Sequence, residues 1–372
     1  MLCMILVSCT GQKTGKENDN NDKIAIEVGG IKFPPQDVLQ LKSYYLSSSV
    51  HVDSIDYLIG YNYRLHSLDC MNLKSKSVTQ IVLPGDGPDA IVRLSGIYAQ
   101  SLDSVWISDE SERAFLIDSV GTIKRMIDLK KYLEDQEQLL INTNYAMFTS
   151  HLFYNASRHS LMFLVKHTPS NTFIVKEAFI DEVGKMATYQ LSSSKVVPDM
   201  SKGYAYINFP NVNFVGENIV YNYPVESSIY MLDIRTNERK YILADSHYTS
   251  NIIEKCTTSG DYATLEKHWL ENSHFYDIMY LPKYKIYARL HADKVDFDEK
   301  KGMEKLINER DLYLMLFDEN MEKIGETKLS NCRYSPFTSW NATYGGIALF
   351  VDNVLDEKNN TDDLTIDIIS LK

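Results

Sequence analysis

The chain has 372 residues, of which 44% are hydrophobic, 24% are charged and only ten are prolines, a composition that excludes a disordered or fibrous protein. The formal net charge of -12 repels phosphate backbones and anionic membrane surfaces, so we expect no nucleic-acid partner. Tyrosine is abundant at 25 copies, which favours the half-buried surfaces of β-sheets.

The first element in chain order is a short apolar run that ends at Cys9. Residues 1–9 (MLCMILVSC) are too few to span a bilayer, which takes about 20 residues. Residues 6–9 (LVSC) resemble the lipobox of bacterial lipoproteins, which implies a lipid on Cys9, although no Lys or Arg precedes it as in a full secretory signal. Residues 10–23 contain no apolar side chain and are typical of a solvated tether. The alternative is that residues 1–9 form the first buried strand of the domain.

From about Tyr57 onward, short apolar runs alternate with clusters of Asp, Asn, Gly and Ser, which predicts antiparallel hairpins. Four segments share one pattern, in which an apolar strand ends in an aspartate, a turn follows, and the next strand carries a basic residue. These aspartates are Asp69, Asp118, Asp233 and Asp318. We expect each of them to accept hydrogen bonds from the amides of the turn that follows. Lys166 occupies the corresponding place in a further repeat.

With a last unit at residues 333–372, the repeats make six units. They predict an all-β fold, a six-bladed β-propeller of four-stranded antiparallel blades. Two intervals between markers are longer than the others and contain polar or helix-like material. We interpret residues 250–272 and 293–310 as insertions between strands.

The last unit is one strand short at its C-terminal end. Residues 23–28 (KIAIEV) form a spare strand near the other end of the chain and are predicted to close the ring by pairing the two ends. A seven-bladed ring is the alternative, with a degenerate blade after Asp233. The chain then divides into a signal segment (1–9), a tether (10–23) and one propeller domain (24–372), which we expect to be a monomer.

One blade, between residues 83 and 125, carries a family resemblance. It contains a Gly-x-Gly-Pro turn at residues 85–88, the sequence DSVWI at 103–107, a strand ending at Asp118, and the sequence GTI at 121–123. In this arrangement it resembles the TolB-like six-bladed propeller lipoproteins of Gram-negative gut anaerobes. The resemblance implies a propeller that is anchored by lipid in the outer membrane of the cell envelope, and it implies no particular reaction.

The sequence offers no assignable catalytic, cofactor-binding or metal-binding residue. Residues 85–90 (GDGPDA) have the letters of a dinucleotide fingerprint, but Pro88 and a short strand follow where a helix should begin, so we interpret them as a turn between blades. Serine-hydrolase, P-loop, zinc-protease and EF-hand patterns do not occur. Acidic residues around the channel of a propeller enzyme can hold a divalent cation such as calcium, but the sequence does not separate them from turn aspartates.

Three histidines, His151, His159 and His167, recur every eight residues. Because residues 155–159 are predicted to form a turn, the three do not share a strand. We therefore expect hairpin histidines rather than a metal site.

Three cysteines follow Cys9 and lie far apart: Cys70, Cys256 and Cys332. In an oxidising periplasm, Cys70 and Cys332 are the pair to test for a disulfide. We favour the other interpretation, in which all three are buried thiols.

Aromatic residues are the candidates for ligand contact. Trp106 lies in an apolar strand and is predicted to be core, whereas Trp269 lies in an insertion and is the better surface candidate. Two Tyr-Asn-Tyr clusters, at residues 61–63 and 221–223, and a third tryptophan, Trp340, can also stack on a sugar or peptide. The loop at residues 86–93 is a further candidate.

The function that we expect is a lipid-anchored, non-catalytic binding or scaffold module that holds a protein, peptide or glycan with loops on one rim. The alternative is a hydrolase or lyase acting on sugars or lactones with a divalent cation in the channel. Three or more converging Asp, Glu, Asn or His side chains at the channel mouth favour the enzyme. An apolar or merely polar channel with aromatic rim loops favours the binding module.

Overall fold

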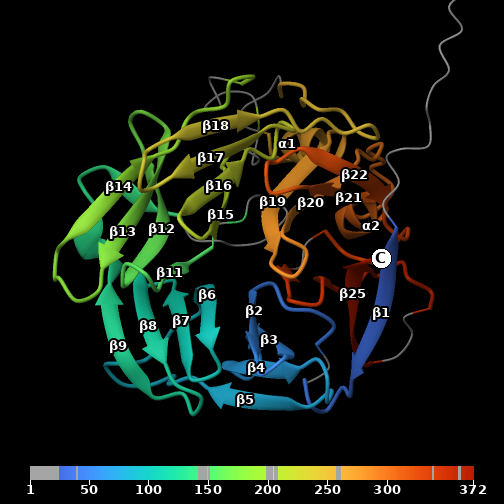
Figure 1. Ribbon diagram of the computed structural model, residues 1–372. Coiled ribbons are helices and arrows are strands. Elements are labelled where there is room, and N and C mark those ends of the chain that lie inside the picture. The colour runs from blue at the N-terminus through green and yellow to red at the C-terminus, as the bar shows by residue number, and fades with distance from the viewer. Residues whose placement is uncertain are drawn as a thin grey trace, which may run out of the picture.

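The chain forms a ring of six antiparallel sheets around a central axis (Figure 1). This computed structural model describes residues 25–38, 41–140, 149, 151–197, 204, 208–256, 261–336, 339–358 and 362–372. The predicted all-β, six-bladed propeller is confirmed, and the seven-bladed alternative is wrong. Cys9 and the tether at residues 10–23 lie outside the described residues.

The first three blades follow one another along the chain. Blade 1 contains β2 (Ser47–Val52), β3 (Ile55–Asn62), β4 (Ser67–Asn72) and β5 (Val78–Val82). Blade 2 contains β6 (Leu94–Ser101), β7 (Ser104–Asp109), β8 (Arg113–Ile117) and β9 (Ile123–Asp128), followed by a 3-10 turn, η1 (Leu129–Tyr132). Blade 3 contains β10 (Glu137–Leu139), β11 (Phe153–Asn155), β12 (Ser160–His167), β13 (Thr172–Phe179) and β14 (Met186–Gln190). The two short strands β10 and β11 pair with different halves of β12 and share one strand position.

The other three blades complete the ring. Blade 4 contains β15 (Asn211–Val215), β16 (Asn218–Asn222), β17 (Ile229–Asp233) and β18 (Arg239–Ile242). Blade 5 contains β19 (His274–Leu281), β20 (Ile286–Ala292), β21 (Leu312–Phe317) and β22 (Lys323–Lys328). Blade 6 contains β23 (Trp340–Ala342), β24 (Ile347–Phe350), β25 (Leu364–Leu371) and β1 (Ile26–Phe33).

The ring closes by pairing the two ends of the chain, as predicted. Strand β1 lies antiparallel to β25, with Ile26 opposite Leu371 and Phe33 opposite Leu364. The closing strand therefore lies slightly later than the predicted residues 23–28. The two predicted insertions contain the helices α1 (Tyr262–Leu270), between blades 4 and 5, and α2 (Met303–Asn308), between β20 and β21.

The core lies between the blades rather than at the centre of the ring. Among the described residues, each of the six hydrophobic clusters joins two adjacent blades, and together they cover every junction. At the junction of blades 1 and 2, for example, Ile59 packs in one cluster with Ile107 and Phe115, all of them fully buried. Because a single blade cannot bury both of its faces, the closed ring is the arrangement that removes all of this surface from water.

Three of the four repeated aspartates form the predicted turns. The carboxylates of Asp118, Asp233 and Asp318 each accept hydrogen bonds from two amides of the following turn. The prediction for Asp69 is wrong, because Asp69 lies in the middle of β4 and is fully buried. The turn after β4 uses Asn72 instead, whose side-chain oxygen accepts from the amides of two turn residues.

Lys166 is not a repeat marker of the same kind. It lies in β12, the strand before β13, which is the strand that corresponds to those ending at the turn aspartates. The third hairpin therefore follows Phe179, where β13 ends. The regular spacing of the markers predicted Lys166. Blade 3 breaks this spacing because its inner strand position is shared by β10 and β11, which are separated in sequence.

Cys70 and Cys332 are not joined by a disulfide. Cys70 is buried between blades 1 and 2, Cys256 is also buried, and Cys332 is partly exposed, so the expectation of three buried thiols holds for two of them. Within the part of the chain that the structure describes, no helix has the length and apolar character needed to cross a membrane.

Candidate functional site

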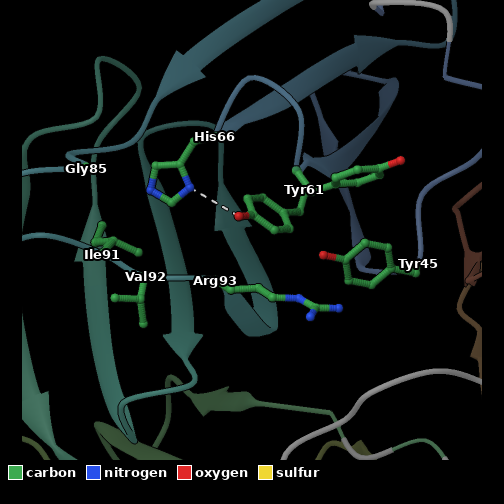
Figure 2. Close-up of a pocket in the computed structure, with 8 residues that line it drawn as sticks. Tyr45, Tyr61, His66, Gly85, Ile91, Val92 and Arg93 are labelled. Carbon is green, nitrogen blue, oxygen red and sulfur yellow. Dashed lines mark hydrogen bonds between the residues drawn. The ribbon is translucent and has the colours of Figure 1, made fainter.

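A groove opens between blades 1 and 2, on the rim where β3 ends and β6 begins (Figure 2). It encloses about 950 Å³. The lining residues, which define the rim groove, are Tyr45, Tyr61, Tyr63, His66, Gly85, Ile91, Val92 and Arg93. The structure thus brings together two candidates from the sequence, the cluster at residues 61–63 and the loop at residues 86–93. Nothing in the sequence marks Tyr45 and His66, because they join the groove only through the packing of the two blades.

One wall of the rim groove is the turn between β3 and β4. The buried side chain of Asn62 accepts hydrogen bonds from the amides of Arg64 and Leu65, at 3.2 Å each. The turn ends at His66 in a left-handed conformation, with a φ of 51°, which few non-glycine residues adopt. His66 Nδ1 lies 3.1 Å from the hydroxyl of Tyr61 (Figure 2). The turn therefore fixes two side chains of the groove in relation to each other.

The opposite wall is the connection between β5 and β6, and blade 2 holds it in place. The buried carboxylate of Asp109 accepts from the amide of Val92 at 3.2 Å. Arg113 forms an ion pair with Asp109 at 3.0 Å and donates to the carbonyl of Ala90 at 2.6 Å. Both walls are therefore rigid before any ligand arrives, which lowers the entropic cost of binding.

The rim groove carries one exposed cation among aromatic rings. The guanidinium carbon of Arg93 lies 5.8 Å from the ring centroid of Tyr45, and its Nε lies 3.5 Å from Glu110. Burial raises the pKa of Tyr45, although the neighbouring Arg93 opposes part of this shift, and burial also raises the pKa of Tyr61. The groove thus presents neutral phenols and a positive charge, and residue Tyr63 is 51% exposed.

A second hollow, the central cavity, lies on the propeller axis and encloses about 350 Å³. All six blades contribute to its lining through their inner segments. Representative lining residues, one from each blade, are Ser49, Tyr98, Phe153, Asn213, Asp277 and Asn341.

The central cavity has enough polar side chains to meet the criterion for an enzyme, three or more converging Asp, Glu, Asn or His residues. Their contacts do not suit a metal site. Four Asp, Asn or His side chains line it, namely His151, Asn213, Asp277 and Asn341. Asp277 is the one carboxylate among the described lining residues, and both amide side chains donate to protein oxygens. Within the described ranges, no group of three His, Cys, Asp or Glu side chains is placed to hold a metal ion.

The three tryptophans are all buried. Trp106 is 1% exposed and belongs to the core, as predicted. The prediction that Trp269 lies at the surface is wrong, because the last turn of α1 packs inward and leaves this side chain 7% exposed. Trp340, at the start of β23, lines the central cavity and donates from Nε1 to Asp277 at 2.9 Å.

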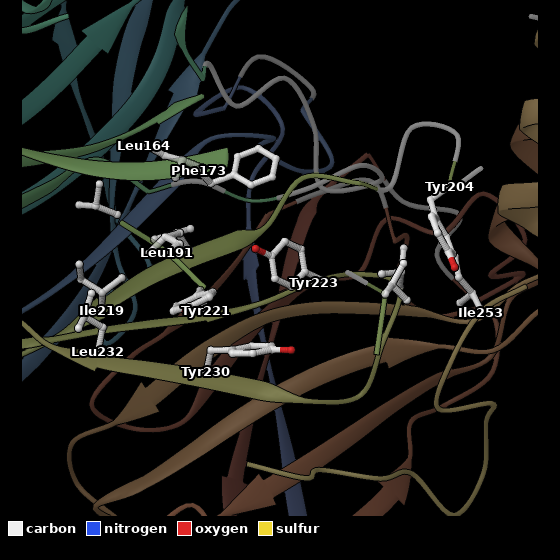
Figure 3. Close-up of a cluster of buried hydrophobic side chains, with 14 of the residues drawn as sticks. Leu164, Phe173, Leu191, Tyr204, Ile219, Tyr221, Tyr223, Tyr230, Leu232 and Ile253 are labelled. Atoms are coloured by element: carbon white, nitrogen blue, oxygen red, sulfur yellow. The ribbon is translucent and has the colours of Figure 1, made fainter. Parts of the chain in front are cut away.

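The second Tyr-Asn-Tyr cluster is part of the core. Tyr221 and Tyr223 are buried between blades 3 and 4 together with Tyr230 (Figure 3). The rings of Tyr221 and Tyr230 stack with their centroids 5.1 Å apart. The two clusters end equivalent strands, β3 and β16, and their first tyrosines are both buried. They differ in the last residue, because Tyr63 is 51% exposed in the rim groove whereas Tyr223 is 1% exposed.

The three regularly spaced histidines do not meet. His151 contacts Asp277 in the central cavity, His159 pairs with Asp181 at the surface, and His167 contacts Ser170. The predicted turn before His159 is confirmed. Asp277 is a functional candidate that the sequence analysis did not single out, although a lone acid within the apolar strand HFYDIMYL is a signal that points to it.

Comparisons with known proteins bear on the fold. Residues 19–328 match the family described as a domain of unknown function (DUF4221). A solved member of that family from Bacteroides vulgatus ATCC 8482 has a TM-score of 0.77 and 14% identity, over 95% of this chain and 99% of that chain. A Bacteroides fragilis NCTC 9343 protein, which its description proposes to be exported, has a TM-score of 0.55 and 14% identity, over 95% and 97%. A search of the curated proteins finds no match.

Proposed function

The chain belongs to the DUF4221 family, and on that premise we propose that it is a lipid-anchored, non-catalytic binding module of the cell envelope. One observation carries the proposal: among the residues that the structure describes, the rim groove is lined by aromatic, apolar and cationic side chains and by no carboxylate or amide side chain. The ligand that fits this chemistry is an extended peptide segment of a partner protein, with an acidic side chain next to Arg93.

The side chains of the groove suit peptide recognition. Tyrosine and arginine provide much of the binding energy at protein interfaces. Tyrosine offers a large contact area with few rotatable bonds, and the planar guanidinium of arginine binds carboxylates and stacks on aromatic rings. The Arg93 side chain is 61% exposed, and its contact with Glu110 is an exposed pair at 3.5 Å. Such a pair contributes little stability, so a ligand carboxylate can replace Glu110 at the guanidinium group.

A glycan fits the same groove less well. Rows of sugar hydroxyls need several acceptors, which carboxylate and amide side chains supply best. None of the described residues that line the rim groove has such a side chain. Apolar Ile91 and Val92 are instead suited to the aliphatic side chains of a peptide.

Binding is tested by fluorescence polarisation with short labelled peptides that combine aromatic and acidic residues, each paired with a version whose acid is replaced by its amide. We expect saturable binding that weakens about tenfold or more in Arg93→Ala and in Tyr63→Ala. The matched control is Tyr262→Ala, which removes a tyrosine that is 63% exposed on α1. Equal binding of acid and amide peptides by the wild type, or binding of a glycan panel in place of the peptides, contradicts the proposal.

The lipid anchor is a separate part of the proposal. It rests on residues 6–9 (LVSC) and on the solvated segment that follows them, and it implies attachment to the outer membrane through Cys9. A Cys9→Ala chain with its native upstream sequence should lose palmitate labelling and leave the membrane fraction. Retention of both in that variant contradicts the anchor while leaving the groove proposal intact.

A further inference from the structure

The central cavity is independent of the rim groove, and the two share no lining residue. Its volume of about 350 Å³ lies within the range of small-molecule sites. The part of its lining that the structure describes contains one carboxylate, that of Asp277, and neither lysine nor arginine. The cavity is thus a small compartment with a single negative charge.

Two donors hold the carboxylate of Asp277, whose side chain is 2% exposed. The indole Nε1 of Trp340 donates to Oδ1 at 2.9 Å, and Nε2 of His151 lies 2.9 Å from Oδ2. An ionised carboxylate only accepts, so Nε2 carries a proton, and in the neutral imidazole Nδ1 of His151 keeps its lone pair.

No described residue donates a hydrogen bond to Nδ1 of His151, and the side chain is 23% exposed where it lines the cavity. In that neutral form Nδ1 is the acceptor nitrogen of a ring that lines the cavity, and the charge of Asp277 behind the ring orients and polarises it. This arrangement selects for a ligand that donates a proton in a hydrogen bond and carries positive charge.

Aromatic rings from three blades line another part of the cavity. Phe153 stacks on Phe214 with their centroids 4.9 Å apart, and Tyr98 meets Phe153 edge to face at 5.1 Å. Aromatic faces attract organic cations, and they do so more strongly where water is excluded.

We propose that the central cavity binds a small organic cation, a primary ammonium on an aryl-alkyl group. The ammonium donates to Nδ1 of His151, and Asp277 balances its charge through the imidazole. The hydrocarbon part packs against Phe153, Phe214 and Tyr98.

A metal ion fits the cavity less well than an ammonium group. Both oxygens of Asp277 already accept hydrogen bonds. Asn213 accepts from the amide of Phe214 through Oδ1 and donates to the carbonyl of Ile278 through Nδ2. A divalent cation needs several free oxygen ligands, whereas an ammonium needs one acceptor, a compensating charge and apolar walls.

Isothermal titration calorimetry with phenethylamine tests the proposal on the full chain, against 2-phenylethanol as the neutral counterpart and phenylacetate as the anionic one. We expect the amine to bind about tenfold or more tightly than the alcohol, and the acid not to bind. Asp277→Asn should weaken amine binding about tenfold or more. The amide would donate to Nε2 of His151, which moves the ring proton to Nδ1 and removes the acceptor along with the charge.

Matched variants separate this site from folding defects and from the rim groove. Asp181→Asn removes the carboxylate of the exposed pair with His159, also 2.9 Å long, and should leave amine binding unchanged, as should Arg93→Ala in the rim groove. If Asp277→Asn does not fold, Tyr98→Leu, which removes one aromatic wall, should weaken the amine about threefold or more.

Three results overturn the proposal. The first is equal affinity for amine and alcohol, and the second is unchanged amine binding in a folded Asp277→Asn variant. The third is thermal stabilisation by Ca²⁺ that competes with the amine, which would make the cavity a metal site. None of these results bears on peptide binding at the rim groove.

Discussion

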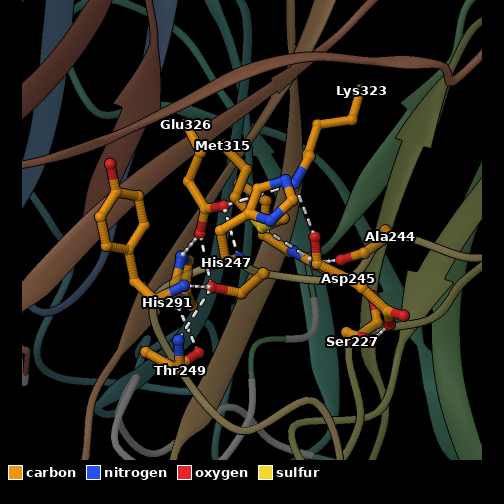
Figure 4. A network of polar contacts seen from close by, with 12 residues as sticks. Ser227, Ala244, Asp245, His247, Thr249, His291, Met315, Lys323 and Glu326 are labelled. Carbon is orange, nitrogen blue, oxygen red and sulfur yellow. Dashed lines mark hydrogen bonds and ion pairs between the residues drawn. The ribbon is translucent and has the colours of Figure 1, made fainter. Parts of the chain in front are cut away.

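At the scale of single residues, the buried carboxylate of Glu326 in β22 is the centre of a network of polar contacts (Figure 4). It accepts from Nε2 of His291 at 2.8 Å, from the hydroxyl of Ser246 at 2.6 Å and from the amide of His247 at 3.0 Å. Thr249 lies 3.2 Å from Nδ1 of His291, so its hydroxyl can donate to a neutral imidazole. The network ties the segment after β18 to blade 5.

Replacing Glu326 by glutamine should lower the free energy of unfolding by about 3 kcal/mol. Removing one partner of a buried ion pair or hydrogen-bond network leaves the remaining groups without compensation, which is strongly destabilising. Glu322→Gln is the control, since this side chain is exposed in the turn before β22. Urea unfolding followed by tryptophan fluorescence measures both variants. Equal stability of the two would show that the network contributes little.

Acidification should destabilise the fold in two stages. Burial lowers the pKa of His291 below its ordinary value of 6.5, although the hydrogen bond to Glu326 opposes this, and burial lowers the pKa of His274 well below that value. Burial raises the pKa of Glu326, but the hydrogen bonds from His291 and Ser246 outweigh it and lower the pKa to about 2, from an ordinary value of 4.5.

For all three groups the unfolded chain binds protons more readily than the folded one. Each group therefore contributes fully to the free energy of unfolding above its unfolded pKa, and this contribution is lost as the pH decreases. The free energy of unfolding should therefore decrease below about pH 6.5 through the histidines, and further below pH 4.5 through Glu326. Urea titrations at a series of pH values measure this. Stability that stays flat from pH 7.5 to 5 contradicts the prediction.

At the scale of elements, the strand-ending aspartate shows what a repeat in the sequence can and cannot predict. The hairpins at Asp118, Asp233 and Asp318 follow from local chemistry, since an aspartate is short enough to bond to the turn beside it. Asp69 has the same neighbours in sequence but faces the core, where Tyr44, Asn62 and Gln80 donate to it. Local pattern alone does not reveal which face of a strand is buried.

The four aspartates should therefore respond differently to the same substitution. Asp233→Ala should cost about 1 kcal/mol, because turn amides lose a partner that water can replace. Asp69→Ala should cost about 3 kcal/mol or more, because it leaves two buried donors, those of Tyr44 and Asn62, without an acceptor. Chemical unfolding of both variants tests the difference, and Asp233→Asn should recover most of the turn's stability. A larger loss at Asp233 than at Asp69 contradicts the structural distinction.

At the scale of the whole molecule, the ring and its closure could be predicted because both correspond to patterns along the sequence. These patterns are six repeated units and one spare strand near the start of the sequence. The sites could be predicted only in part. Residues 61–63 and 86–93 were candidates, but their union with Tyr45 and His66 depends on how blades 1 and 2 pack. The central cavity depends on the register of six inner segments, and no single stretch of sequence contains that information.

Closure through β1 should be essential to the stability of the ring. A chain that starts at Ile24 keeps β1, whereas one that starts at Pro34 leaves β25 as an open edge with unpaired backbone groups. We expect the shorter chain to aggregate or to melt about 10 °C or more below the longer one. Calorimetry and size-exclusion chromatography of the two chains decide this, and equal melting temperatures would refute it.

The central claim is that the rim groove holds a peptide segment of a partner at the cell envelope. Site-specific photo-crosslinking in the native cell tests it most directly, with a benzophenone side chain placed at Tyr63 in the groove or at Tyr262 on α1, positions that are 51% and 63% exposed. We predict a discrete protein adduct from position 63 that is absent from position 262 and is lost when Arg93→Ala is added. The same adducts from both positions, or an adduct at 63 that persists without Arg93, would contradict the claim.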